Sequence, residues 1–383
     1  MALNENELQR ARSYFGLDPD IVFLNHASHG PLPLPARKAY DDYLDSWQKT
    51  EHEHDAESFH IIGELRKKLA ALVGAREDRI GLSHNTTHGY NIVTGGYPWK
   101  SGDNVVLSDG EFPAGIYPWV SLKPLGVELK FAPTRSGFID EEKLISLIDE
   151  DTKAVSLSWV QFNNGYRSDI ARLGEFCRSK GILLCVDAIQ GVGVIPIDFA
   201  SIGADLYTCG CAKWLCGPCG TGFFYLSEKA EKMLRPVNIG WLSVDWQDDF
   251  TDLLRYDLPM RNGPQKYESG TYAYQDLRAL DASIDMHLSF DRDSVWEHIV
   301  SLTGILMEKI ESDDRFELIS SAQDDRRSGV LSFTCENVRA MYQFLRENRF
   351  VVSFREGGIR VSPHFYNTRE EIARLIAALD NFR

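Results

Sequence analysis

Two side chains with useful chemistry each follow a short apolar run. Lys213 lies in CGCAKWLCGPCG (209–220), a turn of small residues after the run 205–208, and Asp187 ends the run 183–187. In open parallel sheets, ligands bind beyond the carboxyl ends of the strands. A lysine in a turn of small residues can approach a planar ligand closely, and its amine can form a Schiff base when its pKa is depressed. We therefore expect both side chains at a ligand site.

The elements that would position these residues alternate between strands and helices. Apolar runs that predict strands lie at 80–82, 104–107, 127–131, 154–158, 182–186, 206–208 and 220–226, and helical patterns lie at 36–47, 59–73, 141–148 and 170–180. Such alternation predicts right-handed βαβ crossovers and an α/β fold with a largely parallel sheet covered by helices.

The last hundred residues have a different pattern. A long amphipathic helix is expected from about Ala282 to Ile310, followed by strands near 316–319, 328–334 and 351–354 and a final helix from Arg369. We predict three parts: an N-terminal arm (1–20) that packs with the small domain, a large domain (21–280) and a small C-terminal α+β domain (281–383).

The composition narrows the class of protein. The 383 residues are 43% hydrophobic and 25% charged, and 41 basic against 56 acidic side chains give a net charge of −15. This balance argues against nucleic-acid or anionic-membrane partners, which need a basic face. No run reaches the ~20 apolar residues that cross a bilayer, and the N-terminus lacks a signal-peptide pattern, so we expect a cytoplasmic protein. Seven cysteines leave at least one unpaired, and reduced thiols are expected.

Six motifs, one of them the paired segments around Asp187 and Lys213, make a family resemblance specific. VDAIQ (186–190) and AKWLCGPCGTGFFY (212–225) resemble the aspartate and lysine signature of the class V aminotransferase family, whose members are pyridoxal 5′-phosphate (PLP) enzymes of fold type I. FLNHASHGPLP (23–33), SHNTTHGYN (83–91), EFPAGIYPW (111–119), KYESGTYAYQ (266–275) and GIRVSPHFYNTREE (358–371) follow in the family's order. The family includes cysteine desulfurases, C–S lyases and isopenicillin N epimerase-like proteins. The resemblance implies a large domain with a seven-stranded, mainly parallel sheet.

The resemblance also implies how the cofactor is held. Lys213 would form the Schiff base with PLP and then act as general base at Cα. Asp187 would pair with the pyridine nitrogen so that the ring acts as an electron sink, and Gln190 would bond the ring's phenolic oxygen. Thr86 and Thr87 lie between a strand and a helix expected to start near Gly89, where free N–H groups and threonine hydroxyls bind phosphate; one threonine could equally be a plain helix cap.

Other residues are expected around the substrate and the second subunit. Phe112 would stack on the cofactor ring, although an aromatic residue after a strand is as often part of a core. Arg360 would hold the α-carboxylate of an L-amino acid. Gly270 and Thr271 resemble the segment that reaches the phosphate of the neighbouring subunit, which implies a homodimer. Four further residues are candidates: Gln161 and Asn163 for the cofactor or substrate, and Asn25 and His26 for the substrate.

The sequence departs from the family pattern at two places that affect the reaction. Gly210 and Ala212 stand where many relatives have serine and histidine, so part of the cofactor environment must differ. No cysteine lies in 351–360, where desulfurases carry a nucleophilic loop cysteine, and Cys335 lies well upstream. Persulfide chemistry on that loop is therefore disfavoured, which leaves elimination, epimerisation and transamination. We favour elimination of the C–S lyase type, because it needs only the base and the electron sink already present.

Three other interpretations compete with this one. The cysteines at 209, 211, 216 and 219 have spacings that a metal could use, but they surround Lys213 in one turn, so we expect buried thiols and no metal. The acidic and histidine-rich residues 51–55 could also bind a metal, but we expect them to be the solvated start of a helix. A NAD(P) enzyme would need a glycine fingerprint after its first strand, which is missing. A non-catalytic binding protein is disfavoured because both Asp187 and Lys213 are present.

Overall fold

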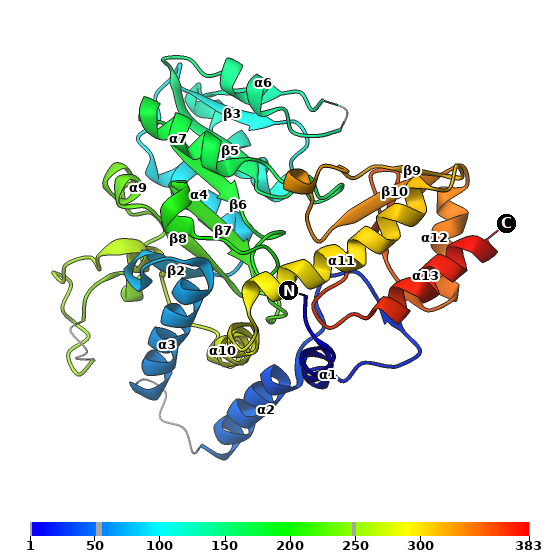
Figure 1. Cartoon of the computed structure of the whole chain (residues 1–383). Helices are drawn as coiled ribbons and strands as arrows, with labels where there is room; N and C mark the ends of the chain where they lie inside the picture. Colours follow the sequence, from blue (N-terminus) through cyan, green and yellow to red (C-terminus); the bar gives the residue numbers. More distant parts are fainter. Residues whose placement is uncertain (1, 51–55, 136, 247–249, 383) are drawn as a thin grey trace.

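The large domain is built on one seven-stranded sheet. The computed structural model describes residues 2–50, 56–135, 137–246 and 250–382. The strand order is β2-β8-β7-β6-β5-β3-β4, and every neighbouring pair is parallel except those that involve β8 (Figure 1). The strands are β2 (Ile80–Ser83), β3 (Asn104–Ser108), β4 (Glu128–Ala132), β5 (Thr152–Ser158), β6 (Leu183–Asp187), β7 (Leu206–Gly210) and β8 (Gly222–Leu226). The seven-stranded, mainly parallel sheet predicted from the resemblance is confirmed.

Helices cover both faces of this sheet, because the strands are apolar on both faces. Val106 and Leu184 belong to one hydrophobic core, whereas their neighbours Val105, Leu183 and Cys185 belong to another. Successive residues of a strand point to opposite faces, so these central strands bury both faces. The helices of this domain are α2 (Leu34–Lys49), α3 (Ala56–Val73), α4 (Thr86–Gly96), α5 (Tyr117–Val120), α6 (Glu141–Ser146), α7 (Ile170–Lys180), α8 (Phe199–Ile202), α9 (Glu228–Met233) and α10 (Tyr274–Leu288).

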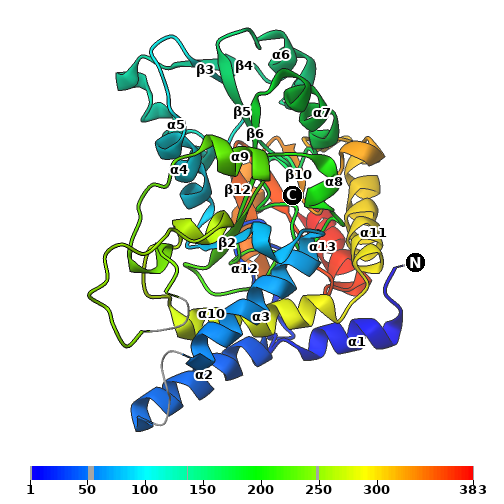
Figure 2. The same cartoon turned by 90° about the vertical axis from the view of Figure 1, so that its left-hand side faces the viewer.

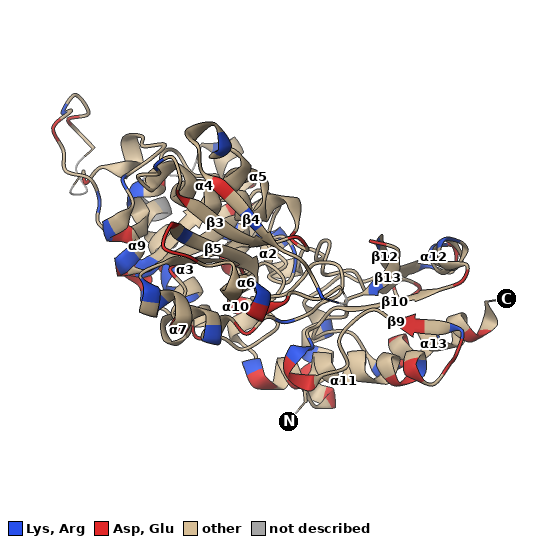
Figure 3. Cartoon of the chain, turned by 90° about the horizontal axis from the view of Figure 1, so that it is seen from above, with Lys and Arg blue, Asp and Glu red and all other residues tan. Residues whose placement is uncertain are grey.

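The small domain has an antiparallel sheet of its own. Its strand order is β12-β13-β10-β9, and Figures 2 and 3 show it beside the large domain together with helices α11 to α13. Figure 3 also shows acidic and basic residues interspersed along the ribbon of both domains. The elements are β9 (Phe316–Leu318), β10 (Leu331–Cys335), β11 (Phe350–Val351), β12 (Ser353–Arg355), β13 (Gly358–Val361), α11 (Arg292–Glu311), α12 (Val338–Glu347) and α13 (Arg369–Asn381).

The N-terminal segment joins the two domains. Strand β1 (Val22–Phe23) pairs in parallel with β11, and Asn25 forms a bridge to Ser362 just after β13. Upstream, Phe15 of the arm packs in the large core, with its ring 4.4 Å from that of Tyr366. Helix α1 (Glu5–Ser13) thus belongs to an arm that contacts the large core as well as the C-terminal segment. This arrangement brings residues 24–30 next to the end of β13 in the sheet of the small domain.

One predicted element is wrong in its extent. The single helix predicted from Ala282 to Ile310 is two helices: α10 ends at Leu288, and Asp291 caps the start of α11, where its side chain accepts a hydrogen bond from Ser294 N. Within α11, Ile299 packs in the large core and Leu302 in the small one. The change of packing partner therefore lies in α11, later than the predicted boundary at 280/281. Among the described residues, we find no helix that is both long and apolar enough to span a bilayer.

Candidate active site

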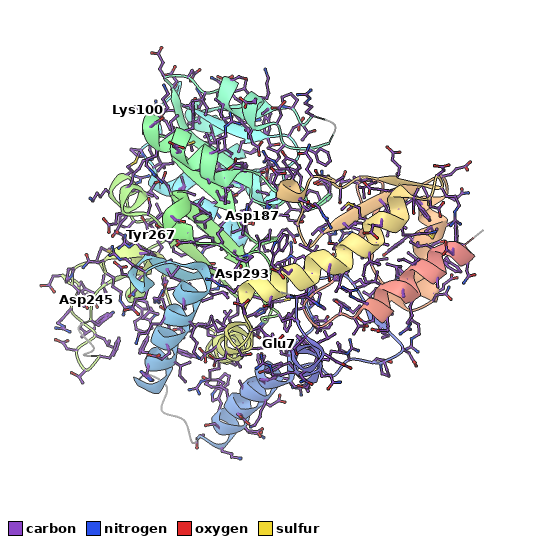
Figure 4. All side chains as sticks on the ribbon, viewed as in Figure 1. Glu7, Lys100, Asp187, Asp245, Tyr267 and Asp293 are labelled. Carbon is purple, nitrogen blue, oxygen red and sulfur yellow. The ribbon has the colours of Figure 1, made fainter. Side chains whose placement is uncertain are left out.

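A cavity of about 390 Å³ opens at the carboxyl end of the parallel sheet. Its walls come from the ends of β5, β6 and β7, from the start of α4, from the loop after β3 and from the N-terminal loop 28–29. Asp187 and Lys213 both line it, and Asp187 is labelled near the middle of the molecule in Figure 4. The strand-end location inferred from the sequence for these two residues is where the structure places them.

Asp187 is a buried acid held in one orientation. It ends β6, and its side chain is almost completely covered. One carboxylate oxygen accepts a hydrogen bond from Ile189 N at 2.9 Å. Burial raises the pKa of Asp187 to about 6, while that hydrogen bond and the Lys213 charge oppose the rise. A cationic ligand nitrogen in the cavity would relieve this cost, because it would supply the positive charge that the buried carboxylate lacks.

Lys213 is an amine whose charge is also disfavoured. It lies in the turn after β7, which Gly30 N secures by donating to Ala212 O at 2.9 Å. Burial lowers the pKa of Lys213 to about 8, with Asp187 opposing the shift and Arg360 adding to it. A large share of the amine is therefore neutral slightly above neutral pH, which is the form that attacks a carbonyl and accepts a proton.

The start of α4 can bind an anion. Asn85 caps the helix by accepting from His88 N, which leaves the N–H groups of Thr86 and Thr87 facing the cavity without intrahelical partners. The Thr86 hydroxyl accepts from Gly210 N at 3.2 Å, so it also ties α4 to β7. The cap is Asn85 and neither threonine; Thr86 makes a structural contact, both threonines line the cavity, and their phosphate role stays a prediction.

The aromatic wall of the cavity is formed by two phenylalanines. Phe112 is 42% exposed, packs edge-on against Phe162 at 5.2 Å between ring centroids, and lies 5.6 Å from the Lys213 amine. A planar ligand attached to Lys213 would therefore lie within reach of the Phe112 ring. The exposure of this ring in the unliganded chain favours the stacking role over a core role.

Arg360 lies behind the cavity and is held by three partners. It is only 2% exposed, and its guanidinium donates to Ser353 Oγ at 3.1 Å, to Ser28 Oγ at 2.6 Å and to Phe162 O. Burial lowers the pKa of Arg360 to about 10, and Arg355 adds to this effect. Because Ser28 and Phe162 both line the cavity, the guanidinium is oriented toward it without lining it in this state.

Three predicted residues lie near the cavity with their polar groups already used or turned away. Gln190 lines the cavity, but its amide donates to Ala27 O and accepts from Trp214 Nε1, so a bond to a ring oxygen would replace one of these contacts. Gln161 lies outside: Val160 and Phe162 line the cavity, and the residue between them faces away toward Ile139 N. Asn163 likewise does not line the cavity, and its carbonyl accepts from Ser332 Oγ.

The other predicted residues are also outside the cavity. His26 is fully buried, its Nε2 is bonded to Tyr366 Oη at 2.7 Å, and burial lowers its pKa to about 3. Asn25 holds the bridge to Ser362. Thr271 lines a neighbouring cavity of about 330 Å³, which shares His84 with the first one. The bridge of Asn25 is made by its backbone, and Asn25 Oδ1 and His26 Nδ1 are buried without a hydrogen-bond partner, so neither side chain contacts the cavity here.

Sequence reasoning missed four residues that line the cavity. Ser28 and His29 belong to the same motif as Asn25 and His26, and they are the members that face the cavity. Phe162 and Cys219 line it as well, and Cys219 is exposed, with its sulfur 3.9 Å from His29 Nδ1. The motif identifies the segment, but which of its side chains point inward depends on the turn that the loop makes.

The possible metal ligands are engaged elsewhere. Cys209, Cys211 and Cys216 are buried, and burial raises the pKa of each thiol. Cys216 approaches His26 and His364, but both ring nitrogens of His364 are used, by Trp214 O and Phe365 N. The histidine-rich segment 51–55 lies outside the described residues.

Taken together, the cavity fits PLP. An acid and an amine with opposed pKa shifts, an anion-binding helix start and an exposed ring surround one space at the end of a parallel sheet. These are the groups needed for a cationic ring nitrogen, an aldehyde, a phosphate and an aromatic face. The fold and site thus define a cofactor-dependent enzyme of the fold-type-I class.

Comparison with known proteins supports this assignment. The sequence model of the family described as Aminotransferase class-V matches residues 22–375. The "Probable cysteine desulfurase" of Methanothermobacter thermautotrophicus is 28% identical, with 94% of each chain covered. The "Isopenicillin N epimerase" of Amycolatopsis lactamdurans is 26% identical, with 96% of this chain and 97% of that one covered. A solved structure of the cystine C–S lyase C-DES with its product cysteine persulfide has a TM-score of 0.86 at 24% identity, over 95% of this chain and 98% of that one.

The chain belongs to the class V aminotransferase family. It is a PLP-dependent enzyme, as the family is, and the fold-type-I architecture expected from the sequence is confirmed. Membership of this family indicates a small-molecule substrate of the amino-acid class.

Proposed function

We propose that the protein cleaves the bond between Cβ and a sulfur leaving group of an L-amino acid. The observation that carries this proposal is the pairing, across one cavity, of a base with a lowered pKa (Lys213) and an oriented guanidinium (Arg360). PLP, when bound, supplies an electron sink for negative charge at Cα. The curated relative named a probable cysteine desulfurase also supports chemistry at a C–S bond.

Each residue then has one task. Arg360 binds the α-carboxylate through two N–H groups and so directs Cα toward Lys213. Lys213 removes the Cα proton, and departure of the sulfur group from Cβ follows, with the electron pair of the Cα–H bond forming the Cα–Cβ double bond. Asp187 holds the ring nitrogen in its protonated form, and Thr87 with the start of α4 holds the phosphate. The eliminated product yields pyruvate and ammonia after addition of water.

A second candidate is desulfuration with a thiol at an unexpected place. Cys219 is exposed in the cavity and lies beside His29, whereas the loop before Arg360 has no cysteine. In this reaction the Cys219 sulfur attacks the sulfur of bound L-cysteine and the Cβ–S bond breaks. The electron pair stays on the substrate carbon, which is protonated. The products are L-alanine and a persulfide on Cys219, so atoms and electrons balance without another reactant.

One experiment separates these reactions. The PLP-loaded protein is incubated in heavy water with L-cysteine, L-cystine and L-alanine, and products are followed by proton NMR while the intact protein is weighed by mass spectrometry. Pyruvate without a change in protein mass supports elimination. Alanine with one added sulfur atom supports desulfuration, provided that Cys219→Ser abolishes both signals and Cys335→Ser, which changes a partly buried thiol in β10, does not. Exchange of the Cα proton with no cleavage of any sulfur substrate would overturn both and favour epimerisation or transamination.

We infer further that the protein is a cytoplasmic homodimer whose sites are completed across the interface. Thr271 faces a cavity next to that of Lys213, and exposed apolar side chains gather in the preceding loop: Ile239, Trp241, Leu253, Leu254 and Tyr256. Mixing inactive Lys213→Ala and Thr271→Ala proteins under subunit exchange should restore activity, because one hybrid site then has both residues. No restoration in a mixture shown to exchange subunits would contradict this.

A further inference from the structure

Glu111 is a second carboxyl behind the cavity that no proposed step uses. It follows β3, and its two oxygens accept from one residue: Ser158 N at 2.9 Å and Ser158 Oγ at 2.5 Å. Both donors belong to the last residue of β5, which itself lines the cavity. The carboxyl is thus fixed at the edge of the site rather than turned to solvent.

The sheet register places this carboxyl near Asp187. Ser158 and Asp187 are direct partners in the parallel pair β5–β6, so the residue that holds Glu111 is the neighbour of the residue that would hold the cofactor's ring nitrogen. Adjacent strands lie roughly 5 Å apart. Two carboxyl groups separated by about one inter-strand spacing repel each other appreciably when both are charged in a partly buried site.

The other groups around Glu111 leave its charge uncompensated. Burial raises the pKa of Glu111 to about 7, the two bonds from Ser158 oppose the rise, and the charge of Asp187 adds to it. From α4 the phenol of Tyr90 faces both carboxyls, and its pKa is raised by burial and by their charges. Lys213 on the cavity wall acts on Asp187. No ion pair to Glu111 is found among the described residues.

We propose that Glu111 is a positioning residue that acts through Ser158 on Asp187, adding a second negative charge that favours the protonated form of the cofactor's ring nitrogen. The inference rests on the assignment of Asp187 to the cofactor, but not on which reaction follows. In its charged form Glu111 would strengthen the electron sink, and in its neutral form it would weaken it. The enzyme would then carry a built-in dependence on pH near neutrality that does not involve Lys213.

The test uses Glu111→Gln, because glutamine has nearly the same shape without the charge: its oxygen can still accept from Ser158 N, and its amide N–H can donate to Ser158 Oγ. The matched control is Glu142→Gln, an exposed glutamate on α6 that pairs with Arg172. In cofactor-free protein with ¹³C-labelled aspartate carboxyls, assigned with Asp187→Asn, the pKa of Asp187 should fall by about half to one pH unit in Glu111→Gln. The pH titration of the visible absorbance of the PLP-loaded protein should shift downward by a similar amount. The control should change neither.

A structural role alone would give a different result. If both titrations in Glu111→Gln match those of the wild type, the proposal is overturned. Should this variant not fold, Ser158→Ala serves instead: it removes one donor, disfavours the charged form of Glu111 and should move the Asp187 titration in the same direction. An unchanged titration in a folded Ser158→Ala protein would equally overturn it. Neither readout needs a substrate, so failure of the lyase proposal leaves this test intact.

Discussion

Among the described residues, two sets of oppositely charged side chains, one buried and one facing the cavity, are built in opposite ways. Arg66 and Glu268 form a two-pronged pair at 2.6 and 3.0 Å, and Ile80 O, Leu82 N and Tyr272 Oη complete their hydrogen bonding. Asp187 and Lys213 face one cavity but form no direct ion pair in the described structure. The first pair is closed on itself, and the second is open to a ligand.

The pKa shifts follow from this difference. Burial opposes the charge of Arg66, but Glu268 more than offsets it, so the pKa of Arg66 lies above its ordinary value. Burial wins at the other pair, where the pKa of Asp187 rises to about 6 and that of Lys213 falls to about 8. A closed pair fixes the segment that leads to Thr271, whereas in the open pair the pKa of each group lies closer to neutrality, which suits Lys213 to proton exchange with a substrate.

The largest expected effect comes from breaking the open pair at its amine. Lys213→Ala should lower turnover of any substrate by about 10⁴-fold, because it removes both the covalent anchor of PLP and the base at Cα. Lys100→Ala, at an exposed loop position, is the control and should retain full activity. Steady-state kinetics and the visible absorbance of the loaded protein measure the change. A Lys213→Ala enzyme with near-normal turnover would remove the basis of the assignment.

Breaking the closed pair should instead affect folding. Glu268→Gln leaves Arg66 buried without its counter-charge and should lower the free energy of unfolding by about 3–5 kcal/mol. Urea unfolding of the cofactor-free protein measures this. The double variant Arg66→Met/Glu268→Leu should recover most of the loss, since it leaves no unpaired charge. If the single and the double variant are equally destabilised, the pair stabilises the fold through its packing rather than through its charges.

Replacing the guanidinium of Arg360 should weaken substrate binding more than it slows the chemical step. Arg360→Lys keeps a charge but cannot make the forked contact, so kcat/KM should fall by about 10²-fold, mainly through KM. Arg339→Lys, at an exposed position on α12, is a suitable control. A fall confined to kcat would point to a role at the reacting carbon rather than at the carboxylate.

The smallest expected effect is a difference in how the free energy of unfolding depends on pH. The pKa of Asp187 is raised in the folded state, so its stabilising contribution is complete below about pH 4 and is lost as the pH rises through about 6. Cofactor-free Asp187→Asn should therefore match the wild type in acid and be more stable by about 1–3 kcal/mol above pH 7. Urea titrations at several pH values, with exposed Asp45→Asn as control, would detect this. If the free energy of unfolding depends on pH in the same way in both proteins, burial does not raise the pKa of Asp187.

The sequence contained most of the fold and the centre of the site. Asp187 and Lys213 could be found because each combines a reactive side chain with a strand end, and both signals are local. Gln161 was misplaced because its motif gives the segment, while strand alternation decides which side faces the cavity. Ser28 could not be found, because its role depends on Arg360, 332 residues away. The break between α10 and α11 was missed because apolar periodicity continues across the Asp291 cap.

The same Ser28–Arg360 contact has a consequence for the order of assembly in the cell. A ribosome releases Ser28 early and Arg360 almost last, and the loop around Ser28 also anchors the lysine turn through Gly30. The binding site therefore cannot be complete on a nascent chain, even when the seven-stranded sheet has formed. Substrate binding must therefore await the synthesis of Arg360, and a chain cut shortly before this residue should fold much of its sheet yet bind an amino acid weakly.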